Sequence, residues 1–237
     1  MILPNVMRAF FLFLFLFIFN NSANSAELNG FGTLNATVGV ASQKYSRGFV
    51  ANRNQPTGFI YLDYVSPVGF YVNSALTYDK SDSGSYNNEW CNTPGFKERF
   101  NIITVNLSYQ LCQYQDVTRY GYYQIKLNGE VNKETNVFFN TYIDDTGSSY
   151  NSTRTQSYAG NGIEYGLNHK FGIATGTLKS FIWDNYSTTY SLGVAKEIYD
   201  LNFDLFFHRT IMEDWNTDAS KAANTRSHLI LTVKKTF

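Results

Sequence analysis

The stretch Leu201-Asn-Phe-Asp-Leu-Phe-Phe-His208 decides the fold, because its residues alternate between two chemical kinds. Successive side chains of an extended strand point to opposite faces of a sheet, so residues two apart share a face. Such alternation predicts a β-strand with one apolar face and one mainly polar face. The apolar face carries Leu201, Phe203, Leu205 and Phe207, and the opposite face carries Asn202, Asp204, Phe206 and His208.

The composition predicts a sheet with one face in lipid. Aromatic residues make up 17% of the chain and charged residues 16%, well below the ~25% charge of an ordinary soluble domain. The mean hydropathy is nevertheless negative, at -0.27. A transmembrane β-barrel combines these properties, because lipid-facing and lumen-facing residues alternate and aromatic girdles line both interfaces. We therefore expect an all-β fold, an antiparallel transmembrane β-barrel, with a soluble β-sandwich as the alternative.

The first 26 residues have the pattern of an export signal. Arg8 supplies a positive charge, an apolar run extends from Ala9 to Phe19, and small and polar residues follow from Asn20 to Ala26. This order is typical of a signal peptide, and a spanning helix would need about 20 apolar residues. We expect a signal peptide over 1–26 and a barrel domain over 27–237 in the outer membrane of a Gram-negative bacterium. A retained anchoring helix is the alternative.

The C-terminal stretch Leu229-Ile-Leu-Thr-Val-Lys-Lys-Thr-Phe237 resembles the last strand of bacterial outer-membrane barrels. Phe237 ends the chain, and apolar residues precede it on the same face. Lys235 departs from the pattern, although a lysine near the membrane interface can extend its ammonium group to water. Phe237 is thus the expected signal for the outer-membrane assembly machinery, which with outer-membrane lipid is an expected partner.

Eleven segments have the period of two, centred near residues 37, 60, 74, 105, 125, 139, 165, 178, 192, 205 and 232. A bacterial single-chain barrel closes with an even number of strands and places both chain ends on the periplasmic side. The first periplasmic turn is then Ser66-Pro-Val-Gly69, and the last spans Glu197 to Leu201. We expect twelve strands, with ten as the alternative, and a missing strand would lie within 79–99 or 144–159.

External loops of such barrels are longer and more polar than periplasmic turns. Stretches rich in Gly, Asn and Ser predict loops at 44–55, 79–99, 144–159 and 210–225.

Charged residues mark a candidate pore. Three cations at the top of the first strand and in the loop after it would draw anions toward a pore mouth, or Arg47 would tie the loop to a carboxylate such as Asp63. These cations are Lys44, Arg47 and Arg53. Charges on the polar strand faces would line the lumen and tune its selectivity, or pair across a narrow barrel and plug it. They are Asp63, Lys126, Glu130, Glu164, Asp204 and His208.

The chain has two cysteines, Cys91 and Cys112. An exported protein passes through an oxidising compartment, so a disulfide between them is favoured over two free thiols. With few histidines near them, we expect no metal site, and no cofactor is implied.

Residues 34–72 resemble the N-terminal part of the TorF-family porins, which reads approximately S-D-Y-x-x-R-G, then an eight-residue stretch closing on Pro, D-Y and G-F-Y. Ser42-Gln-Lys-Tyr-Ser-Arg47-Gly48, Pro56, Asp63-Tyr64 and Gly69-Phe70-Tyr71 supply this frame. Gln43-Lys44 replaces the first D-Y pair. The resemblance implies an outer-membrane pore and no particular substrate.

The expected function is passive diffusion of small solutes or ions through the lumen, without energy coupling. A closed structural or adhesive barrel that binds partners through its external loops is one alternative. A lipid-modifying barrel enzyme is another, for which His208-Arg-Thr210 offers a histidine and a hydroxyl. We expect no enzyme, because Asp204 and His208 would lie about 13 Å apart along a strand. The net charge of zero and the lack of a basic stripe argue against nucleic acid.

Overall fold

The structure is a computed structural model that describes residues 26–28, 30–46, 49–52, 55–80, 86–114, 118–145, 161–183, 187–212 and 224–237. The predicted signal peptide lies outside these residues, except for Ala26, and stays a prediction. Arg47 and Arg53 lie outside them as well. Within the described ranges, no helix is long and apolar enough to cross a membrane.

The described residues form fifteen strands. The strands are β1 (Ala26–Glu27), β2 (Thr33–Ala41), β3 (Lys44–Ser46), β4 (Phe49–Asn52), β5 (Thr57–Val65), β6 (Phe70–Lys80), β7 (Tyr86–Phe100), β8 (Ile103–Tyr114), β9 (Thr118–Glu130), β10 (Thr135–Asp144), β11 (Gly162–Phe171), β12 (Ala174–Trp183), β13 (Ser187–Ile198), β14 (Leu201–Met212) and β15 (Asn224–Thr236).

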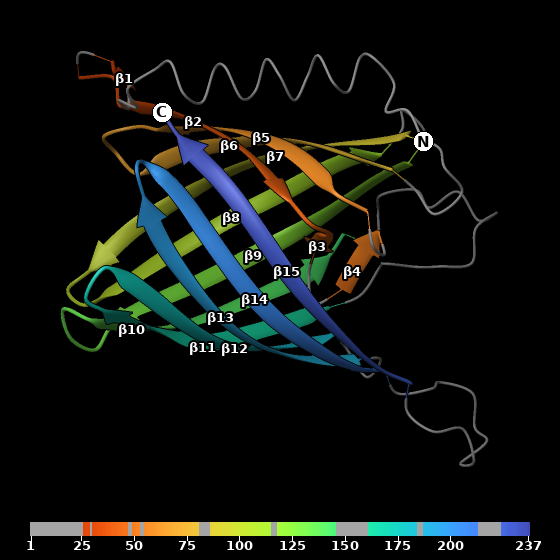
Figure 1. The fold of residues 1–237 in the computed structure, drawn as a ribbon. Helices are drawn as coiled ribbons and strands as arrows, with labels where there is room; N and C mark the ends of the chain where they lie inside the picture. The colour runs from red at the N-terminus through yellow and green to blue at the C-terminus, as the bar shows by residue number, and fades with distance from the viewer. Residues whose placement is uncertain are drawn as a thin grey trace.

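Twelve of these strands close into an antiparallel barrel (Figure 1). Strands β5 to β15 pair in chain order, and β2 joins the two ends, because it pairs with β5 on one side and with β15 on the other. The one sheet contains thirteen strands, but the two-residue β1 pairs only with β2 and adds nothing to the wall. The predicted fold class and the prediction of twelve strands are confirmed.

The strand that the sequence pattern missed is β7, and the predicted external loop at 79–99 is wrong over most of its length. Its outward positions include Asn92 and Pro94, so the apolar alternation is broken there. The structure satisfies Asn92 locally, since the Ser74 hydroxyl donates a hydrogen bond of 2.9 Å to its Oδ1. The Trp90 indole in turn donates to Ser74 Oγ over 2.9 Å. A polar network within the wall therefore replaces the expected apolar repeat.

The turns at one end of the barrel are short, and the chain ends there (Figure 1). The first predicted turn, at 66–69, is closed by a hydrogen bond from Gly69 N to Ser66 O of 3.2 Å. The last joins β13 to β14 through Tyr199 and Asp200, both with positive φ, as the twist of a two-residue hairpin requires. Both turns are confirmed. The predicted loops at 144–159 and 210–225 fall mostly outside the described residues.

The outer surface carries an apolar belt between two rows of aromatic side chains, the arrangement of a barrel that spans a membrane. Near the short turns, the exposed aromatic residues include Phe70, Phe96, Phe100 and Phe171. Toward the other end they are Tyr78, Trp90, Tyr123, Tyr165 and Tyr190. Exposed aliphatic residues such as Leu178 and Leu192 lie between them and face each other on neighbouring strands.

The lipid-facing belt can be tested with Leu178→Arg, a change at the middle of β12 on the outer face. We expect it to lower the free energy of unfolding by about 2–4 kcal/mol, because the charge would have to enter the bilayer centre. Thr177→Arg, one residue away on the inner face, is the matched control and should cost clearly less. Urea titration of both variants in lipid vesicles measures the difference; equal losses would contradict the assignment of the two faces.

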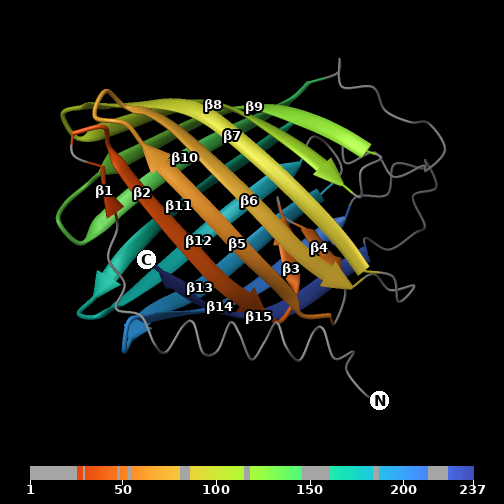
Figure 2. The same cartoon turned by 90° about the horizontal axis from the view of Figure 1, so that it is seen from above.

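One short hairpin does not belong to the wall. Strands β3 and β4 pair only with each other in a separate two-stranded sheet. In two perpendicular views they lie inside the outline of the barrel, toward the end opposite the C terminus (Figures 1 and 2). The predicted loop at 44–55 thus contains a hairpin that folds into the barrel.

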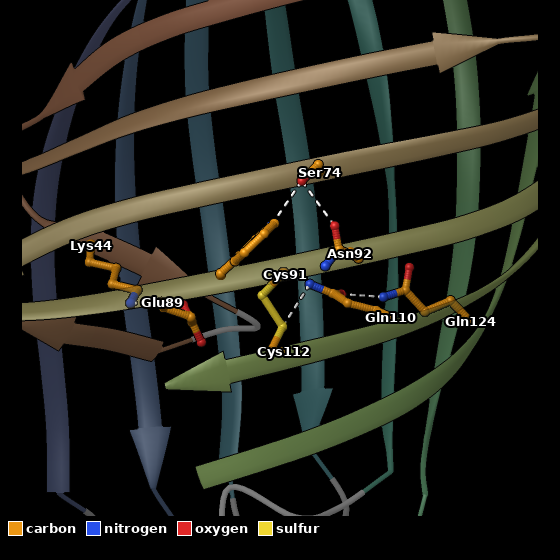
Figure 3. The surroundings of a disulfide bond; sticks show 9 residues. Lys44, Ser74, Glu89, Cys91, Asn92, Gln110, Cys112 and Gln124 are labelled. Carbon is orange, nitrogen blue, oxygen red and sulfur yellow. Dashed lines mark hydrogen bonds and ion pairs between the residues drawn. A yellow bond between two sulfur atoms is a disulfide. The ribbon is translucent and has the colours of Figure 1, made fainter. Parts of the chain in front are cut away.

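The two cysteines face each other on neighbouring strands. Cys91 of β7 and Cys112 of β8 are register partners and are joined by a disulfide, with both side chains buried. Because residues two apart share a face, Cys91 points to the same side as Glu89, toward the interior (Figure 3). The bond therefore fixes the register of β7 and β8 from the inner side.

Replacing both cysteines, Cys91→Ser with Cys112→Ser, should lower the free energy of unfolding by about 3 kcal/mol, because the closed loop of 21 residues restricts the unfolded chain. Urea unfolding monitored by tryptophan fluorescence measures the change, and the reduced wild-type protein is the control that should behave like the double variant. Free-thiol titration should find no reactive thiol in the unreduced, unfolded protein. An identical urea midpoint for all three samples would contradict the role of the disulfide.

Candidate functional site

The inner wall of the barrel is the candidate site. The pairing registers place the six predicted lumen residues on this face: Asp63, Lys126, Glu130, Glu164, Asp204 and His208. Outward neighbours on the same strands, such as Leu205 and Phe207, are exposed on the belt. The period of two places the six lumen residues on one face, but the contacts of these residues depend on which strands are neighbours.

Glu164 of β11 is the centre of a charged cluster. Its carboxylate accepts hydrogen bonds from Lys179 Nζ at 2.8 Å, Asn140 Nδ2 at 2.9 Å and Tyr142 Oη at 3.2 Å. Asn140 is also the register partner of Lys126, so Glu164 has a lysine on the neighbouring strand and a second lysine two strands away on the other side. One carboxylate between two ammonium groups leaves this part of the wall with a net positive charge.

Two other acids of the inner wall also have partners on neighbouring strands. Asp204 of β14 accepts a hydrogen bond from Lys234 Nζ of β15 over 2.7 Å. Asp63 of β5 accepts one from the amide of Asn73 on β6. These contacts join neighbouring strands. They therefore run along the wall and do not cross the lumen.

A third charged pair lies at the rim near the short turns. Arg99 Nη2 of β7 and Glu130 Oε2 of β9 are 2.7 Å apart, and both side chains are more than half exposed. Solvent-exposed pairs of this kind contribute little to stability. Glu130 is thus placed at the end of the pore and not in its middle.

His208 is buried on the inner face, with 3% of its surface exposed. Its Nδ1 lies 2.7 Å from Ser191 Oγ, and its ring stacks on Phe206 with centroids 5.6 Å apart. Thr210, the hydroxyl considered for a lipid-modifying enzyme, instead shares a hydrogen bond of 2.8 Å with Thr189. Neither group reaches the lipid-facing rim, where chemistry on a lipid would take place.

Aromatic side chains fill part of the interior. Tyr122 of β9 and Phe181 of β12 are almost fully buried, with 1% and 2% of their surfaces exposed, and Tyr142 packs against them. The Tyr142 and Phe181 rings have centroids 5.7 Å apart. This cluster lies next to Glu164 on the wall and narrows the interior on that side.

At the mouth, Lys44 does not stand alone as a cation. Its Nζ lies 2.8 Å from Glu89 Oε2, and both side chains are nearly buried (Figure 3). The pair joins the inward hairpin to β7. Of the three predicted mouth cations, only Lys44 is described, and the roles of Arg47 and Arg53 stay predictions.

A carboxylate oxygen of Glu89 and the sulfur atoms of Cys91 and Cys112 lie within 4.8 Å of one another. The two sulfur atoms are bonded to each other, so neither is a thiolate that could bind a metal ion. This group is therefore structural.

The chain terminus closes the wall. Phe237 exchanges two backbone hydrogen bonds with Ala36 of β2, of 2.7 and 3.0 Å, and so continues the β15–β2 ladder to the last residue. Lys235 Nζ lies 5.3 Å from the centroid of the Phe237 ring.

Sequence reasoning missed the partners of the predicted charges. Lys179, Lys234 and Arg99 occupy inner positions of their strands, and the same alternation would have placed the first two on that face. Only the register shows that each lies beside an acid. The inner position of Arg99 could not be predicted, because β7 itself was not recognised as a strand.

Comparison with solved structures identifies the class of fold. The KdgM porin matches with a TM-score of 0.57 and 10% sequence identity, over 86% of this chain and 98% of the porin chain. The NanC porin matches with a TM-score of 0.55 and 9% identity, over 84% and 98%. This chain therefore has the fold of a porin barrel.

A second structure of the first relative, the KdgM porin in complex with disordered oligogalacturonate, matches with a TM-score of 0.56, 10% identity, and coverage of 86% and 98%. No protein-family model and no curated protein matches the chain. The resemblance of residues 34–72 to the TorF family accordingly stays a prediction.

The Glu164 cluster should set ion preference. Glu164→Gln removes the negative charge that pairs with Lys179 and should shift the preference toward anions, whereas Lys179→Gln should shift it toward cations. Reversal potentials under a KCl gradient in planar bilayers measure both. Arg99→Gln, at the exposed rim, is the control and should change little. Shifts of the same sign in the first two variants would contradict a role for the cluster in selectivity.

Proposed function

We propose that this protein is a porin that lets small hydrophilic solutes or ions diffuse passively across the outer membrane. The observation that carries the proposal is the polar inner wall of a closed twelve-stranded barrel, whose charges pair along the wall and not across it. Eight strands enclose only enough space for side chains, whereas barrels of sixteen or more leave a channel. Twelve strands with wall-bound charges leave a path of intermediate width.

The proposal includes export and assembly. Residues 1–26 are the signal peptide, the remainder is the barrel domain, and Phe237 at the end of the closing strand is the element that the assembly machinery recognises. The apolar belt supports outer-membrane lipid as the surrounding medium. The family proposed is the TorF family, supported by the frame in residues 42–71. The protein needs no cofactor for this function and is not an enzyme.

Hydroxylated solutes are the proposed substrates, because amides and hydroxyls occupy much of the inner wall between the charged pairs. Asn168, for example, donates a hydrogen bond to Asn136 on one neighbouring strand and accepts one from Thr177 on the other. The KdgM porin was solved with an acidic oligosaccharide. Oligogalacturonate is therefore a suitable first probe, and a neutral oligosaccharide of equal length is its matched comparison.

The test is single-channel conductance of the refolded protein in a planar bilayer in KCl. Discrete conductance steps, reduced in a concentration-dependent way by one of the two oligosaccharides, are the expected result. Folding is checked beforehand by heat-modifiable migration in detergent gels. A folded barrel that inserts and stays electrically silent would exclude the porin function.

One observation favours a second function, a closed barrel that acts through its external loops. Inner side chains such as Tyr122, Phe181 and Thr189 have at most 2% of their surfaces exposed, so the interior is well filled around them. Under this alternative the same bilayer measurement gives no steps, and Tyr122→Ala with Phe181→Ala opens a path that the native barrel lacks.

A further inference from the structure

We propose that the β3–β4 hairpin is the constriction of the pore and that the ion pair between Lys44 and Glu89 holds it inside the barrel. This inference rests on the proposed porin function and adds the element that limits what passes. It assigns Lys44 a positioning role in place of a free charge at the mouth.

The position of Lys44 shows that the chain turns inward. Lys44 follows the end of β2 by only three residues, yet its ammonium group meets Glu89 on β7. In the wall, β5 and β6 lie between β2 and β7. Three strand spacings of about 4.8 Å separate β2 from β7 by ~14 Å along the wall. The contact therefore requires that the chain leaves the wall and crosses the inner side of β5 and β6.

The β3–β4 hairpin, which comes after β2 in the chain, is wide enough to reduce the open cross-section of the lumen. Among the described residues, its two strands pair in a sheet only with each other, so the ribbon is about 5 Å wide between backbone axes before side chains are added. It lies within the barrel in both views, near the end with the longer connections (Figures 1 and 2). A solute that enters from this end has to pass beside the ribbon.

Glu89, which anchors the hairpin, lies on a strand that the disulfide ties into the wall. Glu89 lies two residues from Cys91 on the inner face of β7, and its carboxylate is within 4.8 Å of the disulfide sulfurs. The disulfide ties β7 to β8, and Gln110 Nε2 lies 3.4 Å from Cys112 Sγ (Figure 3). Loss of the ion pair would therefore move the hairpin and not the wall.

Burial makes the pair specific. The side chains of Lys44 and Glu89 are 11% and 13% exposed. Removing one partner of a buried pair leaves the other charge without compensation, which costs much more than loss of a surface pair. Charges of the same sign at positions 44 and 89 should repel each other and move the hairpin away from β7. Exchange of the two charges should restore the contact.

The experiment uses the full barrel with Lys44→Glu, Glu89→Lys and the double exchange, measured as single-channel conductance in KCl. We expect each single variant to raise the conductance about twofold, because a two-stranded ribbon leaves the cross-section. The double exchange should return the conductance to the wild-type value. Lys133→Glu, a charge reversal of the same size at an exposed position in the short turn between β9 and β10 at the opposite end, is the control and should leave the conductance near that of the wild type.

Folding is checked for every variant by heat-modifiable gel migration, and the double exchange controls for general damage by either substitution. Single variants that conduct like the wild type would overturn the constriction while leaving the porin function intact. Wild-type and variant barrels that are all folded and silent would overturn both. A silent wild type with conducting single variants would support the hairpin as the closing element and reject free diffusion through the native protein.

Discussion

The structure depends on the pairing of β2 with β15, because a membrane-spanning sheet cannot leave an open edge in lipid. Each unpaired backbone N–H or C=O group in the hydrocarbon region would cost several kcal/mol, so only a closed ladder is stable there. Strand β2 supplies partners on both of its sides, and the ladder with β15 extends to Phe237 at the end of the chain. This closure leaves no open sheet edge in the wall and brings the described ends of the chain together on one side of the barrel.

Closure also determines how the interior is filled. Because neighbouring strands are antiparallel and offset, an acid on one strand meets a lysine or amide on the next, as Glu164 meets Lys179 and Asn140. Such pairs compensate buried charges without side chains from the opposite wall. The space that remains is narrowed from within by an element that is not part of the wall, the β3–β4 hairpin, whose contact with Glu89 is the one described ion pair that leaves the barrel sheet.

The alternation in residues such as Leu205 and Phe207 predicted the barrel, its inner and outer faces and most of its strands. It failed at β7, where Asn92 and Pro94 occupy outward positions. A segment with a polar residue at a lipid-facing position can be recognised as a strand only when the hydrogen-bond partner of that residue is known. The partner of Asn92 is Ser74 on β6. The pattern of one segment does not contain this information, because the compensating group lies on another strand.

The sequence by itself determined that the chain forms a membrane barrel and which charges lie on its inner face, since a period of two assigns each residue to one side of a strand. It also indicated the first and last turns through their local chemistry. Only the tertiary structure decided that Cys91 meets Cys112, that Lys179 lies beside Glu164, and that Lys44 folds inward to Glu89. These contacts depend on register and on the path of a loop, and both are fixed by the closure of the whole sheet and not by any single segment.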